Sequence, residues 1–320
     1  MSKILSKTIT IEQGQGKIEC ALVGETATLT RFHSRYPLKL IRPSALLKKT
    51  ALIYSLTYGG GLVCGDVVTM DVAVKKGAKL SMLTQGSTKV FKKRNPNLPL
   101  STDASAQHFK YVIEEDALLV LLPDQVTCFK DAMYHQTQDF RLSGTGSLVL
   151  LDWFTSGRMS RGESWEFAEY NSINNIYHDD KLVLRDAQLI RDDHRVKELE
   201  GDELRSEETK QSMNHFGQRT NYGYRVAPYE CYAILVLYGP QLKTLVHSIL
   251  EQFNQITISP RSSKLPPQSP IWSASVIGDE DGVILRAAAL TTEEIRLFVK
   301  EQLKEIVPLI GDDVYSRILI

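Results

Sequence analysis

Two glycine-rich segments near the start of this 320-residue chain combine residue types that can shape a binding surface. The first, Tyr58 to Asp66, reads YGGGLVCGD, and the second, Thr84 to Phe91, reads TQGSTKVF. Neither has the spacing of a phosphate-binding loop, a zinc-binding HExxH helix or a GxSxG nucleophile turn. We therefore interpret their glycines as tight turns at strand ends that expose polar side chains: Gly59, Gly60, Gly61, Gly65 and Gly86.

Oxygen-bearing side chains also lie at strand ends, where they could hold a divalent cation. Carboxylates stand beside predicted turns or strand ends at Asp66, Asp124, Asp152 and Glu163, and hydroxyl and amide groups lie nearby in the sequence. A sparse set of hard oxygen ligands binds such an ion weakly, which suits its passage better than its storage. The alternative for each aspartate is structural, namely that it caps its own turn by hydrogen-bonding to the backbone.

Cys64 offers a second kind of chemistry, because a cysteine between glycines could act as a nucleophile. In that interpretation the Gly59–Gly61 turn is an oxyanion or phosphate cradle, and the protein is a hydrolase or transferase. The seven histidines are scattered, with no two at i, i+2 or i, i+4, so the sequence predicts no preformed high-affinity metal site. The four cysteines form no CxxC pair, which argues against a zinc ribbon or a disulfide scaffold.

The charge balance argues against nucleic-acid and membrane partners. The chain carries 38 basic and 38 acidic residues, so no long-range field attracts a polyanion. Its first twenty residues lack the apolar core of a signal peptide, and the longest apolar runs, such as 231–238, are too short to span a bilayer. We therefore expect a soluble, cytoplasmic protein.

A repeated pattern of strand, turn and strand predicts a mainly β fold. Residues 66–74 alternate apolar and polar side chains, a turn follows at about residue 77, and residues 79–84 return as a second strand. The pattern recurs with turns at about residues 116 and 146, a spacing of 30 to 39 residues. We expect stacked antiparallel β-hairpin layers, solenoid-like or in a sandwich, that share one core. The polar tails of the return strands would then converge on one side of the stack.

The second half of the chain differs in composition. Residues 191–220 are dense in charge and poor in large apolar residues, which predicts a surface excursion. Helical spacing of apolar residues predicts two amphipathic helices, one over Gly239–Phe253 and one from Thr291, where Glu294 completes a capping box. Further strands are expected in short apolar runs: 181–184, 188–190, 231–237, 271–277 and 283–288. We expect a single domain, 1–320, in three parts: stacked hairpins at about 17–190, the excursion at about 191–220, and an α/β part at about 221–320.

Four motifs of the chain share their order and rough spacing with segments of a known family. They are YGGGLVCGD from Tyr58, TQGSTKVF from Thr84, LPDQVTCF from Leu122 and GRMSRGE from Gly157. These motifs resemble the urease accessory protein D family (UreD, called UreH in some species), whose segments read approximately GGLVGGD, TTQGATK, LPQETIVF and GRxxSGE. The likeness runs from about Lys17 to the C-terminus. In this chain Cys64 replaces a common glycine, Asp124-Gln125 replaces a common Gln-Glu pair, and the charged excursion has no clear counterpart.

The resemblance implies a non-enzymatic maturation factor for urease, a nickel enzyme. Proteins similar to this chain bridge apo-urease and a complex of the accessory proteins F and G, of which G is a GTPase that carries nickel. The resemblance also implies an internal polar route for nickel(II) as transient cargo, with no tightly bound cofactor. The residues expected along the path are Asp66, Thr84, Gln85, Ser87, Asp124 and Glu163, with Cys64 as a secondary candidate. A protein-interaction module with no metal role is a further alternative.

Overall fold

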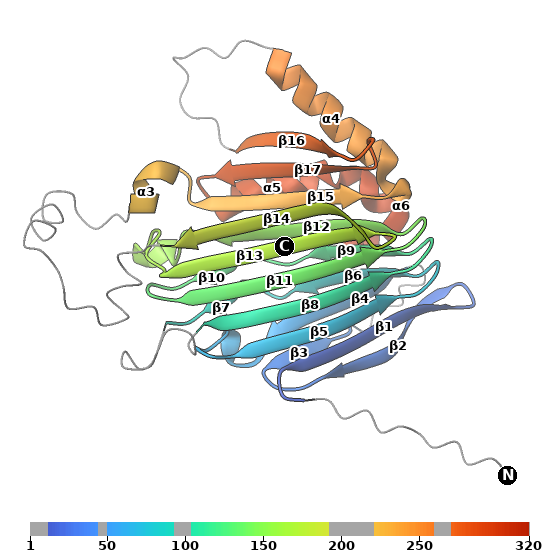
Figure 1. The fold of residues 1–320 in the computed structure, drawn as a ribbon, viewed down its shortest axis with the longest axis horizontal. Helices are drawn as coiled ribbons and strands as arrows, with labels where there is room; N and C mark the ends of the chain where they lie inside the picture. Colours follow the sequence, from blue (N-terminus) through green and yellow to red (C-terminus); the bar gives the residue numbers. More distant parts are fainter. Residues whose placement is uncertain (1–11, 44–49, 93–103, 192–220, 259–269, 320) are drawn as a thin grey trace, which may run out of the picture.

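Two β-sheets form a sandwich in the computed structural model, which describes residues 12–43, 50–92, 104–191, 221–258 and 270–319 (Figure 1). One sheet has seven strands. Their spatial order is β14 (Lys181–Arg191), β13 (Glu169–His178), β11 (Met133–Leu142), β8 (Ser105–Ile113), β5 (Val67–Val74), β1 (Gln15–Val23) and β2 (Thr26–Ser34).

The second sheet has ten strands. The main row runs in the order β16 (Ile271–Ile277), β17 (Gly282–Ala289), β15 (Cys231–Tyr238), β12 (Ser147–Thr155), β9 (Leu118–Leu122), β6 (Lys79–Thr84), β4 (Ala51–Thr57) and β3 (Leu38–Ile41). Beside this row lie two short strands, β7 (Thr88–Val90) and β10 (Val126–Cys128), and β10 pairs with both β7 and β12. The chain is therefore mainly β, as its sequence predicts.

The predicted antiparallel hairpins are wrong, because the two strands beside each repeated turn belong to different sheets. β5 pairs in parallel with β8, whereas β6, across the turn at residues 75–78, pairs in parallel with β9. The same crossing separates β8 from β9 and β11 from β12. All five residues of β9 and all nine of β12 are buried, which is typical of parallel strands covered on both faces. Alternation in a strand reveals its buried face but not its pairing partner.

The repeated turns themselves lie next to one another. Leu118 N donates a hydrogen bond to Ala78 O at 3.0 Å, and Ser147 N donates to Ala117 O at 2.9 Å. The regular spacing of these turns in the sequence thus corresponds to neighbouring strands within each sheet.

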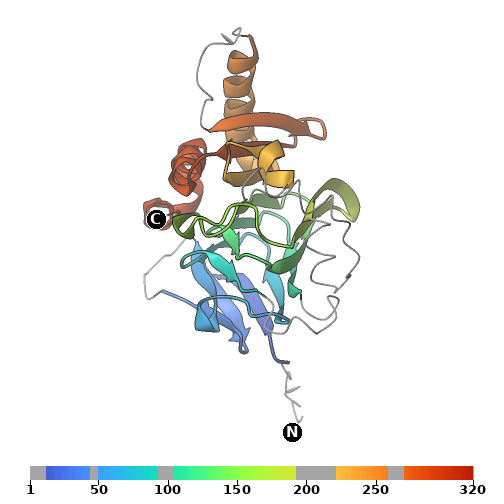
Figure 2. The ribbon, with the colours of Figure 1, turned by 90° about the vertical axis from the view of Figure 1, so that its left-hand side faces the viewer.

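Two apolar layers hold the molecule together. The layer between the sheets contains Phe154, which stacks on Tyr170 with ring centroids 4.2 Å apart. The other layer lies between the ten-stranded sheet and the helices α4 (Lys243–Ile258) and α5 (Thr292–Gln302), and it contains Trp153. Figure 2 shows both helices beside β15, β16 and β17, at the opposite end of the molecule from β1 and β2.

Both predicted amphipathic helices are present. α4 begins after a 3-10 turn, four residues beyond Gly239, and continues to Ile258. α5 follows the predicted capping box: Glu294 N donates to Thr291 Oγ1 at 3.3 Å, and Thr291 N donates to Glu294 Oε2 at 3.2 Å. Shorter helical segments are α3 (Asn221–Val226), α6 (Val307–Ile310), α7 (Asp312–Tyr315) and the 3-10 turns Tyr58–Gly60, Met159–Arg161, Pro240–Leu242 and Lys304–Ile306.

The later part of the chain continues the ten-stranded sheet, because β15 pairs with β12. The strands predicted at 231–237, 271–277 and 283–288 are β15, β16 and β17, and the two predicted at 181–184 and 188–190 form the single strand β14. Of the predicted charged excursion, only Arg191 belongs to the described residues, and it ends β14. In the part of the chain that the structure describes, no helix combines the length and apolar character needed to cross a membrane.

Candidate functional site

Parallel pairing brings polar tails to one edge of the ten-stranded sheet. β6, β9 and β12 run in the same direction, so their C-terminal ends lie together. Asp124 N, after β9, donates to Thr84 Oγ1 at the end of β6 (2.7 Å), and Gly86 N donates to Asp124 Oδ2 (2.8 Å). The hydroxyls of Thr127 and Thr155 are hydrogen-bonded at 3.1 Å, which connects β10 to β12. The predicted convergence of the tails is confirmed.

Asp124 connects three segments at this edge. Besides the Gly86 N–H, its carboxylate accepts a hydrogen bond from the Thr84 hydroxyl at 3.3 Å and from the Arg296 guanidinium at 3.0 Å. Arg296 belongs to α5, so the ion pair ties the C-terminal part of the chain to the loop after β9. The Asp124 side chain is 11% exposed and that of Arg296 is 22% exposed, so water and salt screen this pair only weakly.

Asp66 and Glu163, both expected on the nickel path, have structural partners. Asp66 Oδ2 accepts a hydrogen bond from Val63 N at 2.8 Å, so this side chain caps its own turn. Glu163 forms a two-point ion pair with Arg158, and its Oε2 lies 2.8 Å from Arg158 Nε. That ion pair holds the pKa of Glu163 below its usual range. The Arg158 guanidinium also lies over the Phe129 ring, 4.1 Å from its centroid.

The first glycine segment forms a tight turn against β7. Gly59 and Gly60 both have φ angles of 78°, in the left-handed region that glycine enters without strain. At Gly61 a Cβ atom would lie 2.5 Å from Lys89 O, so any larger residue would push β7 away. Leu62 N donates to the same carbonyl at 2.8 Å, and this N–H group is therefore not free to cradle an anion.

Three predicted path residues lie in loops at the same end of the sandwich. Cys64 is half-buried before β5, next to Gly65, whose φ angle is 82°. Gln85 is exposed and Ser87 is half-buried, and they flank Gly86, whose φ angle is 85°. Within the described ranges, no three side chains of His, Cys, Asp or Glu are placed to hold a metal ion together.

A strip of buried polar side chains lies between the two sheets, and it includes the carboxyl group of Asp152 of β12. Asp152 is 4% exposed, and its Oδ2 accepts hydrogen bonds from Ser172 Oγ and Asn174 Nδ2, both at 2.7 Å. Ser172 and Asn174 are alternate residues of β13, so both side chains face the interior. The strip therefore links the sheets by hydrogen bonds between buried side chains.

Three glutamines extend this polar strip. Gln136 Nε2 donates to Ser172 Oγ at 3.0 Å, and Gln138 Nε2 donates to Asn174 Oδ1 of the same strand, β13, at 2.9 Å. The Tyr134 hydroxyl lies 2.6 Å from Gln107 Oε1 and 2.8 Å from Gln136 Oε1. Each of these side chains thus has a hydrogen-bonding partner inside the sandwich, which lowers the cost of burying it.

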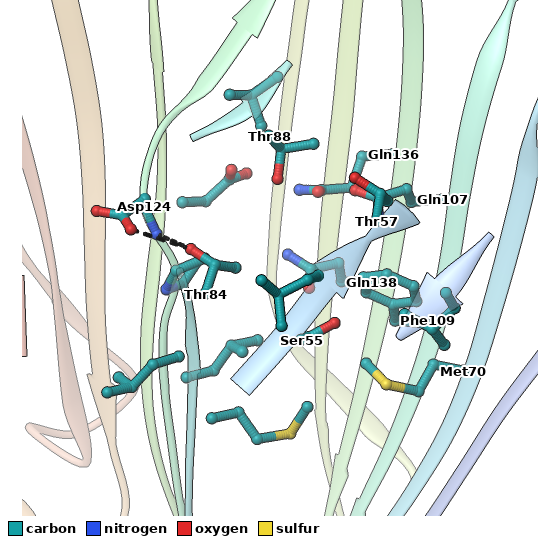
Figure 3. Close-up of a pocket in the computed structure, with 18 of the residues that line it drawn as sticks. Ser55, Thr57, Met70, Thr84, Thr88, Gln107, Phe109, Asp124, Gln136 and Gln138 are labelled. Carbon is teal, nitrogen blue, oxygen red and sulfur yellow. Dashed lines mark hydrogen bonds between the residues drawn. The ribbon is translucent and has the colours of Figure 1, made fainter. Parts of the chain in front are cut away.

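A cavity of about 60 Å³ adjoins the polar strip (Figure 3). Its volume is enough for a few water molecules. Figure 3 shows the three glutamines facing the same space as the bonded pair Thr84 and Asp124. The polar residues that line the cavity include Thr84, Gln107, Asp124, Gln136, Gln138 and Asp152. Of the seven predicted path residues, the structure therefore brings Thr84 and Asp124 together at this cavity.

Burial shifts the pKa of the Asp152 carboxyl group. Loss of hydration raises the pKa of its carboxyl, and the hydrogen bonds from Ser172 and Asn174 oppose this effect. Burial also raises the pKa of Tyr134. A carboxyl among hydroxyl and amide groups presents hard oxygen atoms, which can replace water molecules around a divalent cation.

Sequence reasoning placed Asp152 near a strand end but missed the glutamines of β11 in the polar strip around it. The signal lies in residues 134–140, where Tyr134, Gln136, Gln138 and Phe140 occupy alternate positions and so share one face of β11. All four are buried, and the two glutamines lie between the two aromatic residues. Amide side chains at alternate positions between large apolar ones indicate a polar strip on the buried face of a strand.

Comparison with known proteins identifies the family. A sequence model described as UreD urease accessory protein matches residues 12–317. The chain belongs to this family. The UreD-family protein is 34% identical to urease accessory protein D of Arabidopsis thaliana, over 94% of this chain and 99% of the relative. It is 33% identical to urease accessory protein D of Oryza sativa subsp. indica, over 92% of this chain and 93% of the relative.

A fungal relative extends the comparison beyond plants. The UreD-family protein is 32% identical to an uncharacterized urease accessory protein ureD-like of Schizosaccharomyces pombe, over 90% of this chain and 92% of the relative. The resemblance carried by the four sequence motifs is confirmed. The protein therefore has an accessory role in urease maturation.

Proposed function

We propose that this UreD-family protein joins apo-urease to the accessory proteins F and G and passes nickel(II) to urease through the buried polar strip. The observation that best supports nickel passage is the place of Asp152, a buried carboxyl bonded to hydroxyl and amide groups beside a cavity. Burying a carboxyl costs free energy, and such groups with perturbed pKa values cluster at functional sites.

The chemistry of the polar strip fits a route better than a store. Carboxylate, amide and hydroxyl oxygens bind a borderline metal ion more weakly than thiolate or imidazole groups do. An ion held by a few such groups can leave as readily as it enters, which conduction requires. Thr84 and Asp124 line the same cavity at the end of the sheet where β6 and β9 lead into loops. The polar tails at this end bring the strip close to the protein surface.

Asp152→Asn tests nickel passage, because it removes the charge and keeps the shape of the side chain. Apo-urease is matured in cells with the accessory proteins F and G, nickel and either form of this protein. We expect the nickel content of purified urease, measured by mass spectrometry, to fall severalfold while co-purification with apo-urease is unchanged. Asp139→Asn is the matched control, since Asp139 lies on the outer face of β11 and accepts a hydrogen bond from Asn175 at 2.8 Å. Normal nickel content with Asp152→Asn would refute the route and leave the joining role.

A joining role without nickel transfer is the second candidate. It is favoured by the structural partners of Asp66 and Glu163, which cap a turn and form an ion pair. Under this candidate, Asp66→Ala combined with Glu163→Ala leaves the nickel content of urease unchanged whenever the complex still assembles. The hydrolase or transferase alternative makes a different prediction, namely turnover by the isolated protein that Cys64→Ala abolishes.

A further inference from the structure

β14 is an open edge of the seven-stranded sheet. It stands at the end of the strand order and, among the strands that the structure describes, pairs only with β13. With 11 residues it is the longest of the four described strands that end the two main rows, since β2 has nine, β16 has seven and β3 has four. Its sequence, KLVLRDAQLIR, contains no proline to block pairing. A long edge strand of this kind is a template for pairing with another chain.

The register of β13 determines which backbone groups of β14 face the open side. Asp179 N donates to Leu142 O at 3.0 Å, so odd-numbered residues of β13 direct their backbone groups toward β11. These groups alternate along a strand, and the even-numbered residues of β13 therefore face β14. Their partners in the register, such as Gln188 opposite Ser172, use their backbone groups for this pairing. The intervening residues of β14 direct their N–H and C=O groups outward: Arg185, Ala187 and Leu189.

A groove of about 590 Å³ lies beside this open edge. Figure 1 shows β15, β17 and β16 continuing past β14, so no described strand of the other sheet lies over this part of the ten-stranded sheet. Asp186 of β14 and Arg286 of β17 form an ion pair at 3.0 Å within the groove. The groove is otherwise lined largely by apolar surface, which includes Tyr232, Ile234, Ile271 and Ala288.

The charges along β14 favour an acidic occupant. Lys181 and Arg185 are exposed, and neither has an acidic partner among the residues that the structure describes. Asp186, the only acidic residue of the strand, is neutralised by Arg286. Leu189 lies on the same face as Arg185 and is 58% exposed, so an apolar neighbour is also favoured there.

We propose that β14 accepts an extended segment of a partner protein, which pairs with the open edge, places a carboxylate opposite Arg185 and covers the groove with apolar side chains. Strand addition of this kind takes its affinity from backbone hydrogen bonds and its specificity from alternate side chains. The surface gives the joining role a place on the molecule and does not depend on the nickel route.

The test uses a fluorescent peptide of about nine residues, alternating valine and threonine, with one central glutamate, and a companion with lysine instead. Binding to the purified full-length protein is measured by fluorescence anisotropy. We expect the glutamate peptide to bind roughly tenfold more tightly than the lysine peptide. Hydrogen exchange of the segment 185–191 should slow when the glutamate peptide is bound.

Two substitutions locate the binding on the edge. Ala187→Pro removes an outward N–H and leaves the pairing with β13, so we expect affinity to fall roughly tenfold, whereas Ala187→Val keeps the N–H and the affinity. Arg185→Glu should reverse the preference between the two peptides, and it serves as the test if Ala187→Pro does not fold. The proposal is overturned if the glutamate peptide shows no saturable binding, or if neither Ala187→Pro nor Arg185→Glu changes it. A dimer of the free protein that Ala187→Pro disperses would also overturn it, because a second copy would then be the occupant.

Discussion

The ion pair between Asp124 and Arg296 yields a quantitative prediction about how α5 is held to the cavity edge. Asp124→Ala removes the acceptor of hydrogen bonds from Gly86 N, the Thr84 hydroxyl and the Arg296 guanidinium. A hydrogen bond to a charged group contributes about 1.5–3 kcal/mol, and removing one partner of a fully buried pair costs about 3–5 kcal/mol. Because the two side chains are 11% and 22% exposed, we expect the lower end of this range, about 3 kcal/mol.

Urea and thermal unfolding measure this loss. An unfolding entropy of about 2.1 cal/mol/K per residue gives about 0.7 kcal/mol/K for 320 residues, so the Tm should fall by about 4 °C. A cycle with Arg296→Ala and the double variant isolates the ion pair, for which we expect a coupling of about 1–2 kcal/mol. Asp71→Ala, an exposed aspartate of β5, is the control and should change stability by less than about 0.5 kcal/mol. A coupling below about 0.5 kcal/mol would refute the reasoning, because α5 would then be held by its apolar face alone.

Three further predictions concern single side chains. The pKa of Asp152 is raised in the folded state, so its contribution to stability falls as pH rises from the ordinary aspartate pKa through the raised one. Asp152→Asn should therefore gain stability relative to the native protein between acidic and neutral pH, measured by urea unfolding at several pH values. Phe154→Ala should cost about 3–5 kcal/mol, because the ring is buried and stacks on Tyr170, and a Tm unchanged by this substitution would contradict that packing. Thr291→Ala should cost about 1 kcal/mol through loss of the capping box with Glu294, whereas Thr291→Ser should restore most of it in the same thermal assay.

The strands beside the three repeated turns could be predicted from the sequence, but their pairing could not. Turns were placed correctly near Gly77, Asp116 and Gly144, which all have positive φ angles. Whether such a turn leads to an antiparallel neighbour or across to a second sheet depends on what covers each strand. For β9 and β12 that cover includes α4 and α5, which lie more than 80 residues later in the chain. The continuous apolar runs Leu118–Leu122 and Leu148–Leu151 were local signs of strands buried on both faces.

Contacts between residues close in the sequence could be predicted, whereas contacts between distant residues could not. The capping box joins Thr291 and Glu294, three residues apart, so a sequence pattern predicts it. The pair of Asp124 with Arg296 joins residues 172 apart, and no pattern in either segment indicates the other. The partners of Asp152 were within reach of sequence reasoning only in part, because alternation marks their shared face but not which strand faces them.

Stability can separate a functional from a structural role for Asp152. The amide oxygen of an asparagine could accept the same hydrogen bonds from Ser172 and Asn174 without a buried charge. If Asp152 served only to link the sheets, Asp152→Asn would be at least as stable as the native protein and equally able to support urease maturation. A variant that gains stability and loses nickel delivery cannot owe that loss to misfolding. The result would then assign the carboxylate to the passage of the ion, because the folded state alone has no need of its charge.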